Sequence, residues 1–173
     1  SIYDISEKLK GQNVKSIIEK NDFSKNMNEI CQKIDIVHLF NRNIENLSGG
    51  ELQRLAITLT LLSNADIYIF DEYCSYLDVK QRLIVTQLIR DIIDNDRSKY
   101  VIIVEHDLAI LDYVSDYVQS FYGKPSVYGV VTTKGNVSHG INEFMEGFIR
   151  SDNVRFRPYE LTFKNNKNED KEK

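Results

Sequence analysis

The sequence of 173 residues has few residues that cross-link or stiffen a chain: two cysteines, two prolines and no tryptophan. Cys31 and Cys74 lie far apart, so they form neither a disulfide framework nor a metal-binding motif, and we expect two reduced thiols. No apolar run reaches the roughly 18 residues that a membrane-spanning helix needs. The chain also starts without a signal-peptide pattern. These absences exclude a disulfide-stapled secreted domain and predict a soluble, cytoplasmic protein without a membrane partner.

A phosphate-binding glycine loop is also missing. None of the eight glycines opens a G-x-x-x-x-G-K-[ST] pattern. Gly123-Lys124 is followed by Pro125, and Val118 stands where the first glycine of the pattern would be. Basic residues are not in excess, because the sequence has 22 Lys and Arg against 26 Asp and Glu. The net charge of −4 does not favour DNA or an anionic membrane as a partner, although it leaves room for a local basic patch.

Residues 47–62 predict a capped helix. Ser48 and Glu51 have the S-x-x-E spacing of a capping box, with Ser48 as the N-cap. Apolar residues then recur at helical spacing: Leu55, Ala56, Leu59 and Leu62. Gly49 and Gly50 leave the first backbone N–H groups of the helix unobstructed. This helix N-terminus is therefore a candidate anion site at which a phosphate can dock.

Residues 65–70 form an apolar run of strand length that ends in Asp71-Glu72. The run predicts a buried parallel strand. In open α/β sheets the ligand lies beyond the carboxyl ends of the strands, where these two carboxylates are expected.

A strand–helix–strand unit is expected to follow. Asp78 can cap a helix over residues 79–94. Residues 100–104 are a second apolar run, which ends in Glu105-His106-Asp107. A crossover helix makes the two strands parallel, so Glu72 and His106 should emerge at the same edge if the strands are neighbours.

Shorter elements are expected on both sides of this unit. Residues 1–46 carry scattered apolar positions and predict two or three short helices in a helical subdomain. Residues 108–114 predict another short helix. Residues 117–122 and 127–132 predict a hairpin whose strands extend or edge the sheet.

Four motifs in this order resemble those of the ATP-binding cassette (ABC) ATPases. Ser48-Gly49-Gly50-Glu51 resembles the ABC signature, and residues 67–72 resemble Walker B with its adjoining glutamate. Residues 75–78 resemble the D-loop, and residues 104–107 the switch-histidine region. Any one of these patterns alone is a weak signal, but the ordered set of four is specific.

The resemblance implies roles in phosphoryl transfer from ATP to water. Asp71 would hold Mg²⁺ through its water shell. Glu72 would orient or polarise the attacking water, and His106 would contact the γ-phosphate. It also implies residues that bind ATP held by an opposing ABC domain: Ser48, Gly49, Gly50 and Glu51 of the signature. Asp78 would lie at the seam between the two domains, and this role is compatible with a simple helix cap.

Segments outside these motifs are similar to the ABC-E family, the RNase L inhibitor or ribosome-recycling ATPases. They are residues 75–83, 104–113, 122–130, 140–142 and 153–160. The resemblance implies an α/β fold: a partial P-loop NTPase lobe with a mostly parallel sheet flanked by helices and an N-terminal helical subdomain. It also implies that the chain is the C-terminal part of the first nucleotide-binding domain of a longer protein, and is inactive alone because the phosphate loop is missing.

For that longer protein, the resemblance implies ATP and Mg²⁺ as cofactors, with iron–sulfur clusters outside this chain. The expected partners are the second ABC domain, the ribosome with its rRNA, and translation factors. Arg155 and Arg157 would be rRNA contacts or part of a solvated strand face. The expected division is a signature subdomain over 1–62, a core part carrying Walker B, D-loop and switch histidine over 63–150, a hinge over 151–163 and a disordered tail over 164–173.

One departure and three alternatives stay open. Tyr73-Cys74 stands where the family usually has Pro-Ser. This difference leaves the two carboxylates intact, but the backbone geometry of the D-loop cannot be carried over from the family. An ABC ATPase head of a DNA-repair or chromosome-maintenance protein should carry long heptad repeats, which residues 1–46 lack. A transporter subunit would dock on a membrane partner, and nothing after Asp107 resembles those proteins. A non-enzymatic ribosome-binding module would not need intact Asp71, Glu72 and His106.

Overall fold

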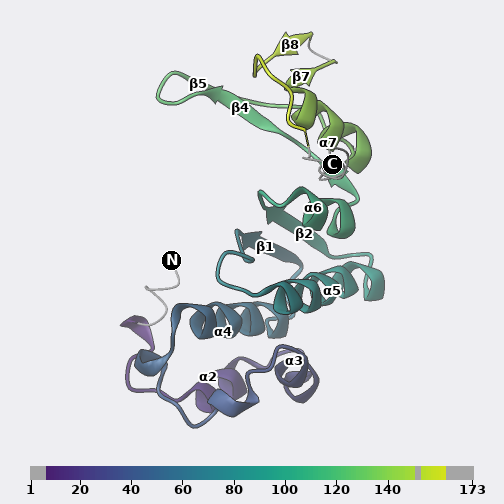
Figure 1. Ribbon diagram of the computed structural model, residues 1–173. Helices are drawn as coiled ribbons and strands as arrows, with labels where there is room; N and C mark the ends of the chain where they lie inside the picture. The colour runs from purple at the N-terminus through teal and green to yellow at the C-terminus, as the bar shows by residue number, and fades with distance from the viewer. Residues whose placement is uncertain (1–6, 151–152, 163–173) are drawn as a thin grey trace, which may run out of the picture. The chain divides into compact units, whose positions relative to one another are not determined.

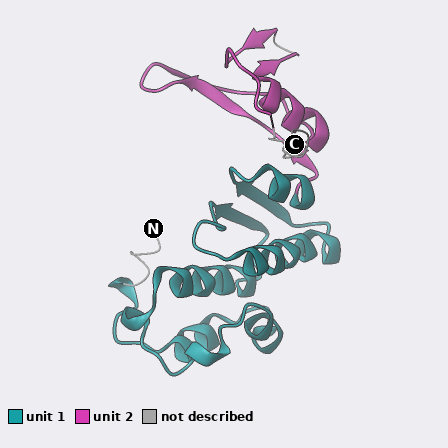
Figure 2. Cartoon of the chain, in the orientation of Figure 1, with its two compact units in different colours: residues 1–114 teal, residues 115–173 magenta. Residues whose placement is uncertain are grey.

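The computed structural model describes residues 7–150 and 153–162, and Figure 1 shows the course of the chain. The chain divides into two compact units, residues 1–114 and residues 115–173 (Figure 2). The expected disordered tail lies outside the described residues, and the division at residues 62 and 150 stays a prediction. None of the helices in the described ranges is both long enough and apolar enough to cross a membrane.

The first unit begins with short helices, as the sequence predicts. They are α2 (Val14–Asn21) and α3 (Met27–Lys33), followed by the 3₁₀ turns η1 (Val37–Leu39) and η2 (Ile44–Asn46). Their apolar residues pack around α4 (Gly49–Leu62), in which Leu55 and Leu62 are fully buried. Truncating one such leucine to alanine costs about 2–5 kcal/mol of folding free energy. This helical layer fixes the start of α4, which carries the signature.

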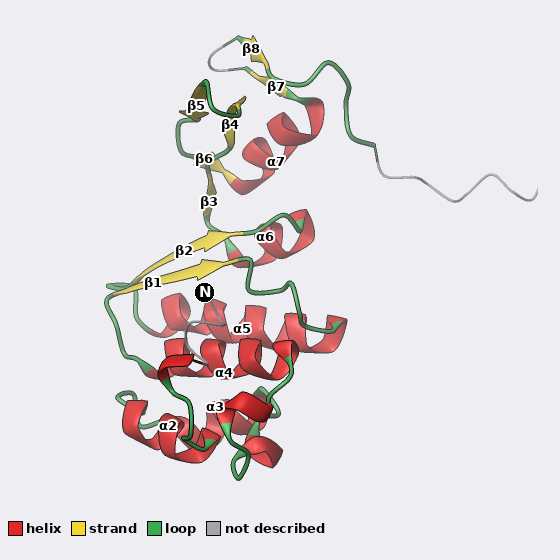
Figure 3. Cartoon of the chain, turned by 90° about the vertical axis from the view of Figure 1, so that its left-hand side faces the viewer, coloured by secondary structure: helices red, strands yellow, loops and turns green. Residues whose placement is uncertain are grey.

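The predicted strand–helix–strand unit is confirmed. Strands β1 (Ile67–Asp71) and β2 (Tyr100–Val104) pair in parallel, with Ile67 opposite Tyr100 and Asp71 opposite Val104. Helix α5 (Val79–Asn95) connects them, and the short helix α6 (Leu108–Val114) follows β2. Figure 3 shows α4 and α5 on one side of the two strands. The carboxyl ends of β1 and β2 therefore lie side by side.

The prediction that the first strand is buried is correct for one face only. Tyr68 and Phe70 are 4% exposed and belong to the core cluster that α4 and α5 complete. On the alternate positions, Ile67, Ile69 and Ile102 are 57%, 64% and 53% exposed. An apolar run indicates burial on both sides of a strand, but burial needs a second layer, and the described residues place helices on one side only.

The second unit contains the predicted hairpin, with shorter strands. Strands β4 (Phe121–Lys124) and β5 (Tyr128–Val131) pair in an antiparallel ladder. The expectation that they extend the β1–β2 sheet is wrong, because each pair in this unit is a two-stranded sheet of its own. A hairpin pairs its own strands across a short turn, at a small entropic cost, and needs no other sheet edge.

Helix α7 (Val137–Glu146) packs against short strands of the second unit. Strand β3 (Tyr117–Val118) pairs with β6 (Gly135–Asn136), and β7 (Phe148–Ile149) pairs with β8 (Val154–Arg155). Neither of these two-residue pairings is predicted from the sequence. Gly147 ends α7 in the left-handed conformation, at φ 68°, where glycine is favoured because it has no Cβ.

Candidate functional site

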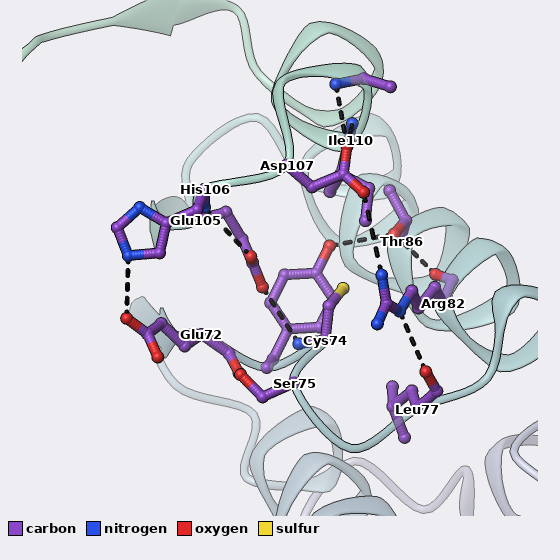
Figure 4. A network of polar contacts seen from close by, with 12 residues as sticks. Glu72, Cys74, Ser75, Leu77, Arg82, Thr86, Glu105, His106, Asp107 and Ile110 are labelled. Carbon is purple, nitrogen blue, oxygen red and sulfur yellow. Dashed lines mark hydrogen bonds and ion pairs between the residues drawn. The ribbon is translucent and has the colours of Figure 1, made fainter.

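Glu72 and His106 meet at the carboxyl edge of the parallel sheet. Glu72 follows β1 directly, and His106 lies two positions after β2 ends. The Nε2 atom of His106 lies 3.0 Å from Oε1 of Glu72 (Figure 4). The backbone N–H of Glu72 also donates to the carbonyl of Val104 at 2.9 Å, which continues the strand pairing by one step. The predicted convergence of these two residues is confirmed.

The backbone of Glu72 adopts an unusual conformation. Its φ angle is 47°, in the left-handed region that residues with a Cβ rarely occupy. Such strain is found mostly where the surrounding structure holds a functional side chain in place. Here it turns the chain sharply out of β1, and the Glu72 side chain reaches toward His106 (Figure 4).

The Glu72–His106 pair is open to solvent. The His106 side chain is 84% exposed and that of Glu72 is 53% exposed. An exposed pair of this kind adds little to stability, because water screens the attraction. The pair is therefore available for a ligand and for water.

Asp71 ends β1 beside this pair. Its side chain is exposed, and the carboxylate makes no hydrogen bond or ion pair with the residues that the structure describes. Nor do three metal-ligating side chains gather anywhere in the described ranges. A single free carboxylate fits Mg²⁺, which proteins usually hold by one or two carboxylates together with substrate phosphates and water. Asp71 is thus a suitable ligand for a magnesium ion that a phosphate brings with it.

The predicted capping box at the start of α4 is confirmed. The Ser48 hydroxyl accepts from the N–H of Glu51 at 3.4 Å, and the Glu51 carboxylate accepts from the N–H of Ser48 at 2.7 Å. The Ser48 N–H bond, with the help of the Arg42 guanidinium, lowers the pKa of Glu51 below its usual value. The Glu51 carboxylate is thus engaged within its own helix end.

The signature glycines lie against the D-loop. The ring of Tyr76 is 3.8 Å from the position of a Cβ on Gly49, and the backbone oxygen of Tyr76 is 3.0 Å from that of a Cβ on Gly50. Within the described part of the chain, no hydrogen bond or ion pair joins the signature residues to Glu72 or His106. The structure therefore places the signature against the D-loop and Glu72 against His106, and the Ser75 hydroxyl, which donates to the Glu72 carbonyl at 3.0 Å, links the D-loop to the second pair.

Asp78 is the N-cap of α5. Its carboxylate accepts from the N–H of Gln81 at 2.8 Å. The helix-cap reading of this residue is confirmed, and its role at a domain seam stays a prediction.

Sequence reasoning missed the contacts that hold residues 73–77 in place. The Gln53 amide donates to the carbonyl of Tyr73 at 3.1 Å, and the Tyr73 hydroxyl bonds the Thr86 hydroxyl at 2.9 Å. The Cys74 N–H donates to Glu105 at 3.0 Å. The Tyr73-Cys74 pair is buried, and burial raises the pKa of both side chains. These partners lie 13 to 31 positions away in sequence, where no local pattern indicates them.

The two arginines of the expected hinge differ in their contacts. The Arg157 guanidinium donates to the carbonyls of Phe144 and Met145 at 2.6 and 2.7 Å, where α7 ends, and to that of Tyr159 at 2.9 Å. Arg155 is exposed and makes one long bond, 3.4 Å, to the carbonyl of Glu146. Arg157 thus caps a helix, whereas Arg155 has donors that are free to meet another molecule.

Comparison with known proteins gives similar sequences and structures. The family described as ABC transporter matches residues 2–75. The chain is 49% identical over 151 residues to the translation initiation factor RLI1 of Chaetomium thermophilum, which covers 87% of this chain and 24% of that protein. The chain therefore spans about a quarter of the length of the curated relatives it matches.

Two solved structures are similar over most of the chain. One is the complex of an archaeal ribosomal stalk protein with the archaeal ribosome recycling factor aABCE1, with a TM-score of 0.89 and 42% identity over 96% of this chain and 32% of that chain. The other is a model of ribosome-bound archaeal Pelota and ABCE1, with a TM-score of 0.87 and 42% identity over 94% of this chain and 27% of that chain.

Proposed function

The chain belongs to the ABC-E family of ATP-binding cassette proteins, and from this we propose that it forms the signature, Walker B and switch-histidine part of an ATPase that recycles ribosomes. The 3.0 Å contact between His106 and Glu72 carries this proposal. A carboxylate and an imidazole at the end of adjacent parallel strands are placed to meet the γ-phosphate of ATP and the water that attacks it.

Each residue of the edge has a separate task in this reaction. The Glu72 carboxylate accepts a hydrogen bond from the attacking water and orients it toward phosphorus. His106 donates from its ring to a γ-phosphate oxygen, which aligns that phosphate with the water. Asp71 would hold the Mg²⁺ that accompanies ATP, and the ion would neutralise part of the phosphate charge. Positioning and charge stabilisation are the main contributions that an enzyme makes to phosphoryl transfer.

The signature acts on a different nucleotide. Ser48, Gly49 and Gly50 present the N-terminus of α4, whose N–H groups and dipole favour a phosphate. As the resemblance to ABC ATPases implies, they act on ATP held by an opposing ABC domain, with Asp78 near the seam. The phosphate loop, the second ABC domain and the iron–sulfur clusters are proposed for the rest of a longer protein, and this chain is proposed as the C-terminal part of its first nucleotide-binding domain.

The proposed partners are the ribosome, with its rRNA, and translation factors in the cytoplasm. The support comes from the two similar structures, in which the family protein is bound to a ribosomal stalk protein or to the ribosome. In the hinge, Arg155 is the proposed rRNA contact rather than Arg157, because the Arg157 donors are already used within the unit.

The test uses the complete protein that carries this chain, in its wild-type and Glu72→Gln forms. We expect Glu72→Gln to lower ATP hydrolysis by at least about a hundredfold while ATP binding persists. Co-sedimentation with ribosomes in the presence of ATP should change with the substitution, because hydrolysis controls release. Equal ribosome binding by both forms, with no ATPase activity in either, would instead favour a ribosome-binding module whose motifs are unused.

A further inference from the structure

The turn after β2 carries a carboxylate that the proposed reaction does not use. Oε1 of Glu105 accepts from the backbone N–H of Cys74 at 3.0 Å, and Oε2 accepts from the N–H of His106 at 3.3 Å (Figure 4). One side chain thus connects the turn that bears the histidine with residues 73–77, which we call the D-loop segment. The bond to Cys74 is charge-assisted, and such bonds are roughly twice as strong as neutral ones.

The far end of the D-loop segment is tied to the same turn. The Arg82 side chain donates from Nε to the carbonyl of Leu77 at 3.0 Å. Its guanidinium also lies 3.9 Å from the carboxylate of Asp107, the residue after His106. Residues 105–107 therefore hold the segment at both ends, directly through Glu105 and indirectly through Arg82.

We propose that Glu105 is a positioning residue that locks the D-loop segment onto the turn carrying His106, so that the two parts move together. Cys74 is 3% exposed. Its N–H needs a partner in the folded chain, because an unpaired buried N–H is costly. The lock is a property of this chain, whereas its consequence for ATP hydrolysis rests on the proposed function.

The two cysteines of the chain provide a reporter and an internal reference. Both thiols are buried, and burial raises the pKa of Cys74 to about 12 and that of Cys31 to about 11. Both are therefore protonated and shielded in the folded chain, and a maleimide reagent reaches them only on opening. Cys31 lies in the separate core cluster formed by α2, α3 and α4. Release of the D-loop segment should expose Cys74 and leave Cys31 covered.

Three variants of the full 173-residue chain test the lock. Glu105→Ala removes the acceptor of the Cys74 N–H. Glu105→Gln removes the charge but keeps an amide oxygen that can still accept this bond. Asp96→Ala is the matched control, because it also removes a carboxylate that accepts a backbone N–H, from Ser98 at 3.0 Å, in a turn away from the D-loop segment.

The measured quantity is the ratio of the maleimide labelling rates of Cys74 and Cys31, obtained by peptide mass spectrometry. We expect Glu105→Ala to raise this ratio about tenfold or more, since the lost bond involves a charged group. Glu105→Gln should raise it less, and Asp96→Ala should leave it unchanged. A constant ratio in Glu105→Ala overturns the proposal, even if both rates rise together through general unfolding. Equal rises in Glu105→Ala and Glu105→Gln also overturn it, because they report only the loss of a negative charge near the thiol.

The coupling to His106 is tested in the complete protein. Glu105→Ala should lower kcat for ATP hydrolysis with a change in KM of less than about twofold, and Glu105→Gln should restore part of kcat. A wild-type kcat in Glu105→Ala overturns the coupling. If the complete wild-type protein shows no ATPase activity, the proposed function fails, and the labelling ratio still decides whether Glu105 locks the segment.

Discussion

Gly50 packs against the backbone of Tyr76, whose carbonyl oxygen lies 3.0 Å from the position that a Cβ on Gly50 would occupy. Gly49, one position earlier, has 3.8 Å to its nearest neighbour, the Tyr76 ring. The two glycines begin the same helix, yet only the second is in tight contact with the D-loop. The contact between signature and D-loop thus depends on the absence of a side chain at one position.

The first prediction compares alanine at these two positions. Gly→Ala within a helix ordinarily gains about 0.5–1 kcal/mol, and we expect Gly49→Ala to be neutral or slightly stabilising. Gly50→Ala should be less stable than Gly49→Ala by about 1–2 kcal/mol, because a backbone oxygen cannot move aside as a flexible side chain can. Urea unfolding followed by circular dichroism measures the difference. Equal stability of the two variants would show that the D-loop gives way freely.

The second prediction concerns the pH dependence of the α4 cap. The Glu51 pKa is lowered in the folded chain, mainly by the Ser48 N–H bond. Its contribution to stability is therefore present above the unfolded value of about 4.5 and is lost as the pH falls through the lowered folded value. We expect Glu51→Ala to cost about 1 kcal/mol at pH 7 and progressively less as the pH falls through the lowered pKa of Glu51. Unfolding of both forms across this range is the measurement, with Glu51→Gln, which keeps a capping oxygen, as the control.

The third prediction is that the 173-residue chain does not hydrolyse ATP by itself. It contains no phosphate loop of the G-x-x-x-x-G-K-[ST] type, so it lacks the backbone cradle and the lysine that position the β- and γ-phosphates. Phosphate release from ATP and Mg²⁺ should be the same for the chain, its Glu72→Gln variant and a buffer blank. Activity that disappears in Glu72→Gln would contradict this expectation.

The fourth prediction separates the two arginines of the expected hinge. Arg157→Ala removes a guanidinium that donates to three carbonyls, and we expect a loss of about 2–3 kcal/mol in the stability of the second unit. Arg155→Ala should change that stability by less than about 0.5 kcal/mol. Hydrogen exchange of peptides from α7 measures both. In the complete protein, Arg155→Ala should weaken ribosome binding more at low salt than at high salt, as expected for a phosphate contact.

The sequence predicts those parts of the fold that short-range patterns control. The Ser48 and Asp78 caps need only a few neighbouring residues, and the meeting of Glu72 with His106 follows from two apolar runs and the rule for parallel crossovers. Other features depend on distant partners. Four acids and a histidine lie at the ends of β1 and β2, and nothing local indicates that Glu105 is the one that bonds Cys74. The exposure of Ile69 depends on which layers cover the strand, which an apolar run does not record.

The open face of β1 and β2 bears on the fate of this segment in a cell. Apolar side chains from both strands lie exposed there side by side, namely Ile67, Ile69, Tyr100, Ile102 and Val104. Chaperones and proteases act on chains that display contiguous apolar surfaces of this kind. A piece of the chain that displays this open face would thus be a target for proteases. The two strands whose ends bring Glu72 and His106 together thus leave, on their open side, an apolar surface of the kind that a second layer or a partner covers in other parallel sheets.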